Sequence, residues 1–82
     1  MAKAQSPVRR ERYEMPADIE GLLKTRKLSE AYAARPPYQR NDYLMWIEGA
    51  KRPETRQKRI DQMLDELKAG DVYMKMAWRP GR

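Results

Sequence analysis

The sequence contains no cysteine and no histidine among its 82 residues. Without thiolate and imidazole groups, the chain lacks the usual ligands of zinc and cannot form disulfides. It also lacks a cysteine nucleophile and a serine nucleophile activated by histidine. Carboxylates are present, but they lie beside basic residues at helical spacing, which is typical of solvated helix faces. We therefore expect a protein that is not an enzyme and that carries no metal ion and no cofactor.

Long apolar runs are also missing. No window approaches the roughly 18 apolar residues of a membrane-spanning helix. The segment 1–12 has basic residues but no apolar run behind them, so it resembles neither a secretory signal nor a membrane anchor. We expect a cytoplasmic protein without membrane insertion. With 82 residues, the chain has room for one domain and little room for a deep pocket.

Acidic residues are outnumbered by basic ones. Lys and Arg total 18 against 12 Asp and Glu, which gives a net charge of +6 and a pI near 9.8. This balance favours polyanionic partners, including nucleic acids, through long-range attraction. The mean hydropathy of −1.05 is low, yet the apolar residues recur at helical spacing, which predicts a folded centre.

The chain divides into three parts by composition. Residues 1–13 carry arginines without apolar periodicity and are predicted to be a flexible basic arm. Residues 14–70 contain the helical periodicity and are the predicted domain. Residues 71–82 are a tail whose loose alternation predicts an irregular or extended segment. The expected fold class is all-α, a small bundle of three to four helices with this arm and this tail.

Four helices are predicted in the central part. The first starts at Pro16, and a second over 28–34 either stands alone or continues the first with a kink. The third spans 37–49, where a run of β-formers also suits a buried strand, but the spacing of the apolar residues favours a helix. The fourth spans 53–69 and stops at Gly70. Its buried stripe is predicted to be Ile60, Met63, Leu64 and Leu67.

The segment 49–59 holds five basic residues and one acidic residue. On a helical wheel, Arg56 lies near the buried stripe, so its predicted role is structural. Its expected partner is a carboxylate such as Asp18, Asp42 or Glu48. The remaining bases and one threonine lie outward or on a flank and are the candidate binding residues: Lys51, Arg52, Thr55, Lys58 and Arg59. Their pattern could suit a DNA-reading helix-turn-helix, but the signal is weak, and the pattern is more typical of an ordinary solvated helix face.

Aromatic and methionine residues offer a second kind of surface. Tyr32, Tyr43 and Trp46 are at core-facing spacing and are predicted to be core. Trp78 is predicted to be the freest aromatic residue. In the tail, Met74 and Met76 suit either gap-filling in a small core or an adaptable strip that binds a protein.

The stretch 43–60 (YLMWIEGAKRPETRQKRI), preceded by MPADI at 15–19 and closed by Gly70, resembles the bacteriocin-protection, YdeI or OmpD-associated family. The family's motif falls on Trp46, Ala50, Lys51, Thr55, Arg56, Arg59 and Ile60. The resemblance implies a compact helical module with no cofactor and no catalytic residues. Of these residues, the structural ones are expected to be Trp46, Ala50, Arg56 and Ile60. In the family the module often follows a small β-rich domain, for which this sequence shows no counterpart.

Two functional hypotheses follow. The first is a small bacterial binding module, linked through its family to bacteriocin protection or envelope stress, whose basic turn and helix start face a nucleic acid, another polyanion or an acidic protein. The alternative is a protein–protein interaction module that uses the Met and Trp residues of the tail and binds no nucleic acid.

Overall fold

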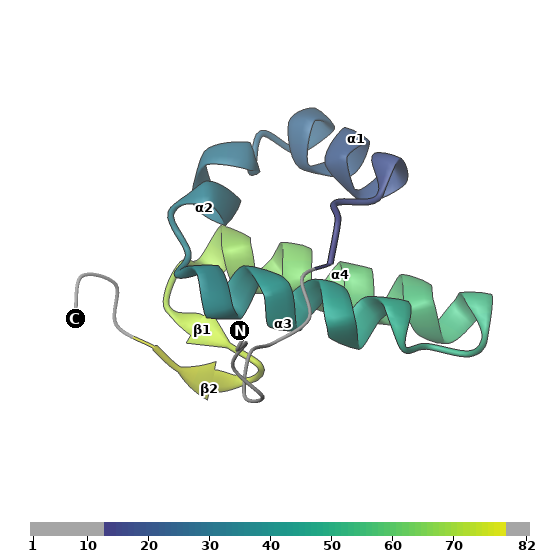
Figure 1. Cartoon of the computed structure of the whole chain (residues 1–82). Coiled ribbons are helices and arrows are strands. Elements are labelled where there is room, and N and C mark those ends of the chain that lie inside the picture. Colours follow the sequence, from purple (N-terminus) through teal and green to yellow (C-terminus); the bar gives the residue numbers. More distant parts are fainter. Residues whose placement is uncertain (1–12, 79–82) are drawn as a thin grey trace, which may run out of the picture.

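The computed structural model describes residues 13–78. Most of the predicted basic arm, residues 1–12, lies outside the described residues. The elements follow the chain in a simple order (Figure 1). They are α1 (Ala17–Thr25), α2 (Ser29–Ala33), α3 (Pro37–Glu48), α4 (Pro53–Ala69), β1 (Val72–Tyr73) and β2 (Met76–Ala77).

Helices α3 and α4 form the centre of the fold. They lie side by side and run in opposite directions, and residues 49–52 connect them (Figure 1). Helices α1 and α2 lie across one side of this pair, and the two short strands lie near the start of α3 and the end of α4. The arrangement is an αα-hairpin, the usual result of a short connection between two helices with facing apolar stripes.

The core is drawn from three helices. Its nine buried apolar residues are Ile19, Leu23, Tyr43, Leu44, Ile47, Ile60, Met63, Leu64 and Leu67. The predicted stripe of α4 is therefore confirmed, and the apolar run of α3 is helical rather than a strand. Burying each such side chain contributes about 1.5–3 kcal/mol, which is the main stabilising term in a domain of this size.

The helix boundaries follow from proline, glycine and backbone geometry. Pro37 and Pro53 each occupy the first turn of a helix, where the missing N–H removes no hydrogen bond. Gly70 ends α4 with a positive φ of 85°. Lys27 also has a positive φ, 60°, which separates α1 from α2. The alternative of one kinked helix over this stretch is therefore wrong.

The tail corrects the predicted fold class, because the chain is mostly but not purely helical. Strands β1 and β2 pair antiparallel, with Val72 opposite Ala77 and Tyr73 opposite Met76. The predicted irregular or extended tail is thus a β-hairpin with a two-residue turn. Both turn residues have positive φ, 52° at Met74 and 64° at Lys75. Such turns usually contain asparagine or glycine, and neither occurs here, so the sequence did not predict the hairpin.

The turn gives a direct prediction. Replacing Lys75 with glycine should raise the free energy of unfolding by about 1 kcal/mol, because a side chain in the left-handed region costs roughly that much and the Lys75 side chain is exposed. Urea denaturation would measure the change. Lys68→Gly, in the right-handed last turn of α4, is the control and should lower stability instead. A loss of stability in Lys75→Gly would contradict the prediction.

Candidate functional site

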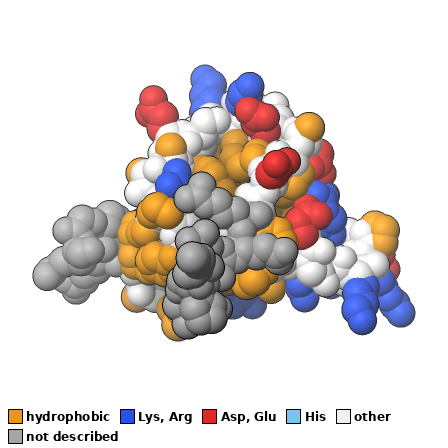
Figure 2. Space-filling model, viewed as in Figure 1, with side chains coloured by type: hydrophobic (Ala, Val, Ile, Leu, Met, Phe, Trp, Pro, Cys, Tyr) orange, Lys and Arg blue, Asp and Glu red, His pale blue; other side chains and the backbone are white. Residues whose placement is uncertain are grey.

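The connection between α3 and α4 carries an exposed group of bases at the end of the αα-hairpin. We call Lys51, Arg52, Thr55 and Lys58 the basic tip; the three bases are exposed and Thr55 is half-buried. Figure 2 shows Lys and Arg side chains gathered at this end of the molecule, on the right of the view. Among the residues that the structure describes, none forms an ion pair with these three bases.

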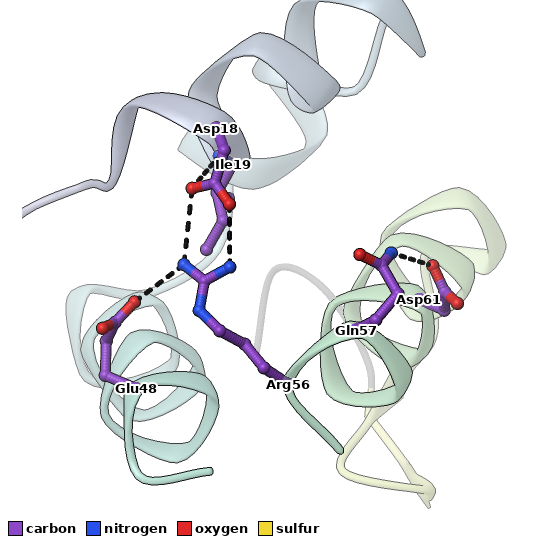
Figure 3. A network of polar contacts seen from close by, with 6 residues as sticks. All are labelled: Asp18, Ile19, Glu48, Arg56, Gln57 and Asp61. Atoms are coloured by element: carbon purple, nitrogen blue, oxygen red, sulfur yellow. Dashed lines mark hydrogen bonds and ion pairs between the residues drawn. The ribbon is translucent and has the colours of Figure 1, made fainter. Parts of the chain in front are cut away.

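Arg56, inside the same segment, has a different role. Its Nη1 lies 2.7 Å from Oδ2 of Asp18, and its Nη2 lies 3.3 Å from Oδ1 of Asp18 and 3.0 Å from Oε2 of Glu48 (Figure 3). The side chain therefore joins α1, α3 and α4. Two of the three carboxylates expected for it are its partners, whereas the third, Asp42, accepts a hydrogen bond from the Tyr73 hydroxyl.

This network also sets the local charge. The hydrogen bonds from Arg56 lower the pKa of Asp18, and those from Arg56 to Asp18 and Glu48 raise the pKa of the guanidinium. Both carboxylates are substantially exposed, so the contribution to stability is modest, on the order of 1 kcal/mol or less per pair. These two acids form ion pairs with Arg56 and with none of the three bases of the basic tip.

Arg59 is not part of the exposed group. Its Nη1 donates a hydrogen bond of 2.6 Å to the carbonyl oxygen of Trp46, and its guanidinium carbon lies 5.3 Å from the centre of the Trp46 ring. These contacts hold a half-buried side chain at the joint between α3 and α4. Of the five candidate binding residues, the structure thus brings together four and assigns the fifth to packing against α3.

The antiparallel arrangement bears on the DNA-reading hypothesis. A helix-turn-helix crosses its two helices at roughly 90–120°, which lets the second helix enter the major groove along its length. Here α3 and α4 run antiparallel (Figure 1). Only the first turns of α4 and the connection before it protrude, so the basic tip can touch a partner over a small area.

A second polar cluster lies at the opposite end of α4, and sequence reasoning missed it. Glu66 is only 5% exposed, although its sequence context suggested a solvated acid that pairs with helix bases. Its Oε1 accepts hydrogen bonds from the Tyr43 hydroxyl and, at 2.8 Å, from the backbone N–H of Met74. Its Oε2 accepts from the backbone N–H of Lys75 at 2.9 Å and from Nε2 of Gln62 at 3.0 Å. One carboxylate therefore anchors the β-hairpin to α4.

Arg35 completes this buried cluster. The side chain is 3% exposed and donates to Oε1 of Gln39 at 3.1 Å and to the backbone carbonyl of Glu66 at 3.0 Å. Gln39 is itself fully buried. Burial raises the pKa of the nearby Tyr43 hydroxyl, and its hydrogen bond to the Glu66 carboxylate raises it further. No buried side-chain nitrogen or oxygen within residues 13–78 lacks a partner, so the cluster is structural.

The tail contributes packing more than free surface. Trp78, expected to be the freest aromatic residue, is half-buried, with the Arg35 guanidinium carbon 4.5 Å from its ring centre. Tyr73 packs edge-on against Tyr43, and Met74 contacts the core. Only Met76, which is 60% exposed, remains as the adaptable surface that the alternative hypothesis needs. The tail therefore offers little of the predicted Met/Trp strip.

Across residues 13–78, no group of three or more carboxylates is placed to hold a metal ion. No helix in that part of the chain is long and apolar enough to cross a membrane.

Comparison with known proteins gives one match. The family described as bacteriocin-protection, YdeI or OmpD-associated matches residues 12–70, which is well over half of the chain. The match extends from the segment before α1 to the glycine that ends α4 and leaves out the β-hairpin. No curated protein and no solved structure gives a significant match.

Proposed function

The chain belongs to the bacteriocin-protection, YdeI or OmpD-associated family, and we propose that it is a non-catalytic binding module of that family whose basic tip contacts the phosphates of a nucleic acid. The observation that supports this most is the group of three exposed bases, Lys51, Arg52 and Lys58, without carboxylate partners among the described residues. We place the module in the cytoplasm, where nucleic acids are available to it.

The electrostatics of the basic tip suit phosphate groups. Lys51 and Arg52 immediately precede the positive end of α4, a helix of 17 residues whose N-cap residue makes no side-chain hydrogen bond. The helix dipole adds to the field of the bases, and the Thr55 hydroxyl can donate a hydrogen bond to a phosphate oxygen. Glu54 opposes this field at one position. The result is a compact cationic protrusion suited to contacts that do not depend on base sequence.

The number of bases sets the expected strength of binding. Three phosphate contacts give a slope of log affinity against log salt of about −2.7 on duplex DNA, since each contact contributes roughly −0.9. We expect micromolar affinity at low salt and steep weakening towards physiological salt. An affinity of this strength is typical of an auxiliary or non-specific contact with nucleic acid.

Fluorescence anisotropy of labelled duplex DNA, single-stranded DNA and RNA across a salt series tests the proposal. The variant Lys51→Glu/Lys58→Glu should lose at least about tenfold in affinity and flatten the slope by about two contacts. Arg26→Glu/Lys27→Glu, at the end of α1, makes the same change in net charge and is the matched control. It should retain most of the affinity.

Two results would overturn the proposal. One is an absence of binding to all three nucleic acids at low salt. The other is an equal loss in both double variants, because that would assign the binding to net charge rather than to the basic tip. Circular dichroism should show the same helix content in all three proteins.

A further inference from the structure

A groove lies beside the first half of α3, away from the basic tip. Its volume is about 410 Å³, within the range of roughly 300–1,000 Å³ that small-molecule sites occupy. Its walls come from the segment before α1, from α2 and from α3. The lining residues are Tyr13, Met15, Tyr32, Pro37, Arg40, Asn41 and Leu44. It is a surface groove, in keeping with a chain that has little room for a deep pocket.

The walls of the groove are fixed to α3 by hydrogen bonds. The backbone N–H of Tyr13 donates to Oδ1 of Asn41 at 2.8 Å, which holds the segment before α1 against the helix. The Tyr32 hydroxyl donates to the backbone carbonyl of Arg40 at 3.4 Å, a long contact that orients its ring on the wall formed by α2. Tyr13, Tyr32 and the buried Leu44 therefore give the groove an aromatic and apolar lining.

The charge in the groove comes from Arg40. Its side chain is half-buried, and it forms no hydrogen bond or ion pair with any residue that the structure describes. The other arginines with reduced exposure, Arg35, Arg56 and Arg59, all have hydrogen-bond acceptors. No acidic residue lies in the first turn of α3. Glu14 and Asp42 each adjoin lining residues in sequence, but neither lines the groove, and Asp42 accepts a hydrogen bond from the Tyr73 hydroxyl.

We infer that this groove binds a small amphipathic anion, with an aromatic or branched apolar body between Tyr13 and Tyr32 and a carboxylate held by Arg40. A guanidinium pairs with a carboxylate through two parallel N–H···O bonds, and partial burial strengthens that pairing. The apolar lining supplies affinity for the body of the ligand, while Arg40 selects for the charge. The inference is independent of the basic tip, which lies beyond the other end of α3.

Amide NMR spectra of the isotope-labelled full chain, titrated with naphthoate, test the site. Naphthalenemethanol, which has the same ring without the charge, is the matched ligand. Naphthoate should shift the amides of the groove residues and bind about tenfold or more tightly than the alcohol, because the charge-assisted pair exists only for the carboxylate.

The variants Arg40→Gln and Arg40→Lys separate the charge from its geometry. Arg40→Gln should reduce the affinity for naphthoate to that for the alcohol and leave the affinity for the alcohol unchanged. Arg40→Lys should have an intermediate affinity for naphthoate, since a lysine keeps the positive charge and loses the planar guanidinium. Arg26→Gln, which removes an exposed arginine directly after α1, should leave the affinity for naphthoate unchanged.

The inference fails if naphthoate and the alcohol bind equally, or if shifts spread over the surface without a maximum at the groove. It fails equally if Arg40→Gln, with dispersed amide signals that show an intact fold, binds naphthoate as well as the unmodified chain does.

Discussion

Replacing Glu66 with alanine should lower the free energy of unfolding by about 3–4 kcal/mol, because the change leaves the buried Tyr43 hydroxyl and three part-buried donors without their acceptor. The carboxylate accepts four hydrogen bonds, of which two come from backbone N–H groups in the β-turn and one from the buried Tyr43 hydroxyl. A domain of this size has only about 5–15 kcal/mol of stability, so the loss should be plain in a urea titration.

In Glu66→Ala, the β-hairpin should open more readily than the helices do. Met74 and Lys75 hold positive φ angles at a cost of about 1–2 kcal/mol each, and their N–H groups point at Glu66. Without the carboxylate, this turn loses its main tertiary contact. Amide hydrogen exchange in Glu66→Ala should therefore accelerate at these two residues far more than along α4.

Asp65→Ala provides the matched control, since Asp65 precedes Glu66 in the same helix but is exposed. Its effect should stay within about 0.5 kcal/mol. Glu66→Gln keeps one acceptor oxygen, so its loss in the free energy of unfolding should lie between those of Glu66→Ala and Asp65→Ala. If Glu66→Ala and Asp65→Ala proved equally stable, the carboxylate would not be the anchor described above.

The second large effect is expected at Arg35, where substitution by alanine should destabilise the fold by about 3 kcal/mol. The change removes two hydrogen bonds from a buried guanidinium, its contact with the Trp78 ring, and the packing of its stem. The acceptor on Gln39 would then be buried without its donor. Urea denaturation gives the loss, and tryptophan fluorescence should shift because the Trp78 ring loses its cationic neighbour.

Arg35→Met separates the two causes, because it keeps an apolar stem and deletes the guanidinium. We expect it to recover part of the loss, about 1 kcal/mol. Arg26→Ala controls for removing one positive charge, and its effect should be within about 0.5 kcal/mol. An unchanged fluorescence spectrum in Arg35→Ala would contradict the placement of Trp78.

The residues that stabilise the fold and the residues proposed to bind a nucleic acid lie in different parts of the molecule. The buried cluster of Arg35, Gln39, Tyr43 and Glu66 joins the connection after α2 to α3, α4 and the β-hairpin. The basic tip lies at the other end of the α3–α4 pair (Figures 1 and 2). Charge substitutions at the basic tip should therefore leave the core intact, which makes the binding tests interpretable.

The sequence by itself determined the central helices α3 and α4, because their signals are local, whereas the break between α1 and α2 came from the structure. The i, i+3, i+4, i+7 stripe from Ile60 to Leu67 fixes the buried face of α4, and Pro53 and Gly70 fix its ends. The same periodicity placed Arg56 near the core, and a half-buried guanidinium needs a carboxylate, so its partners were nearly determined as well.

Only the tertiary structure decided which polar residues are buried. Glu66, Arg35 and Arg59 look like ordinary charges on helix surfaces, and what buries them is chain from elsewhere: the β-hairpin, Trp78, and the end of α3. The hairpin itself has no turn signal at Met74 and Lys75, since its unfavourable backbone angles are stabilised by a carboxylate several residues earlier in the chain. Helical periodicity is a property of neighbouring residues. Burial of a charge depends on a distant segment that supplies its hydrogen bonds, and no local pattern records that segment.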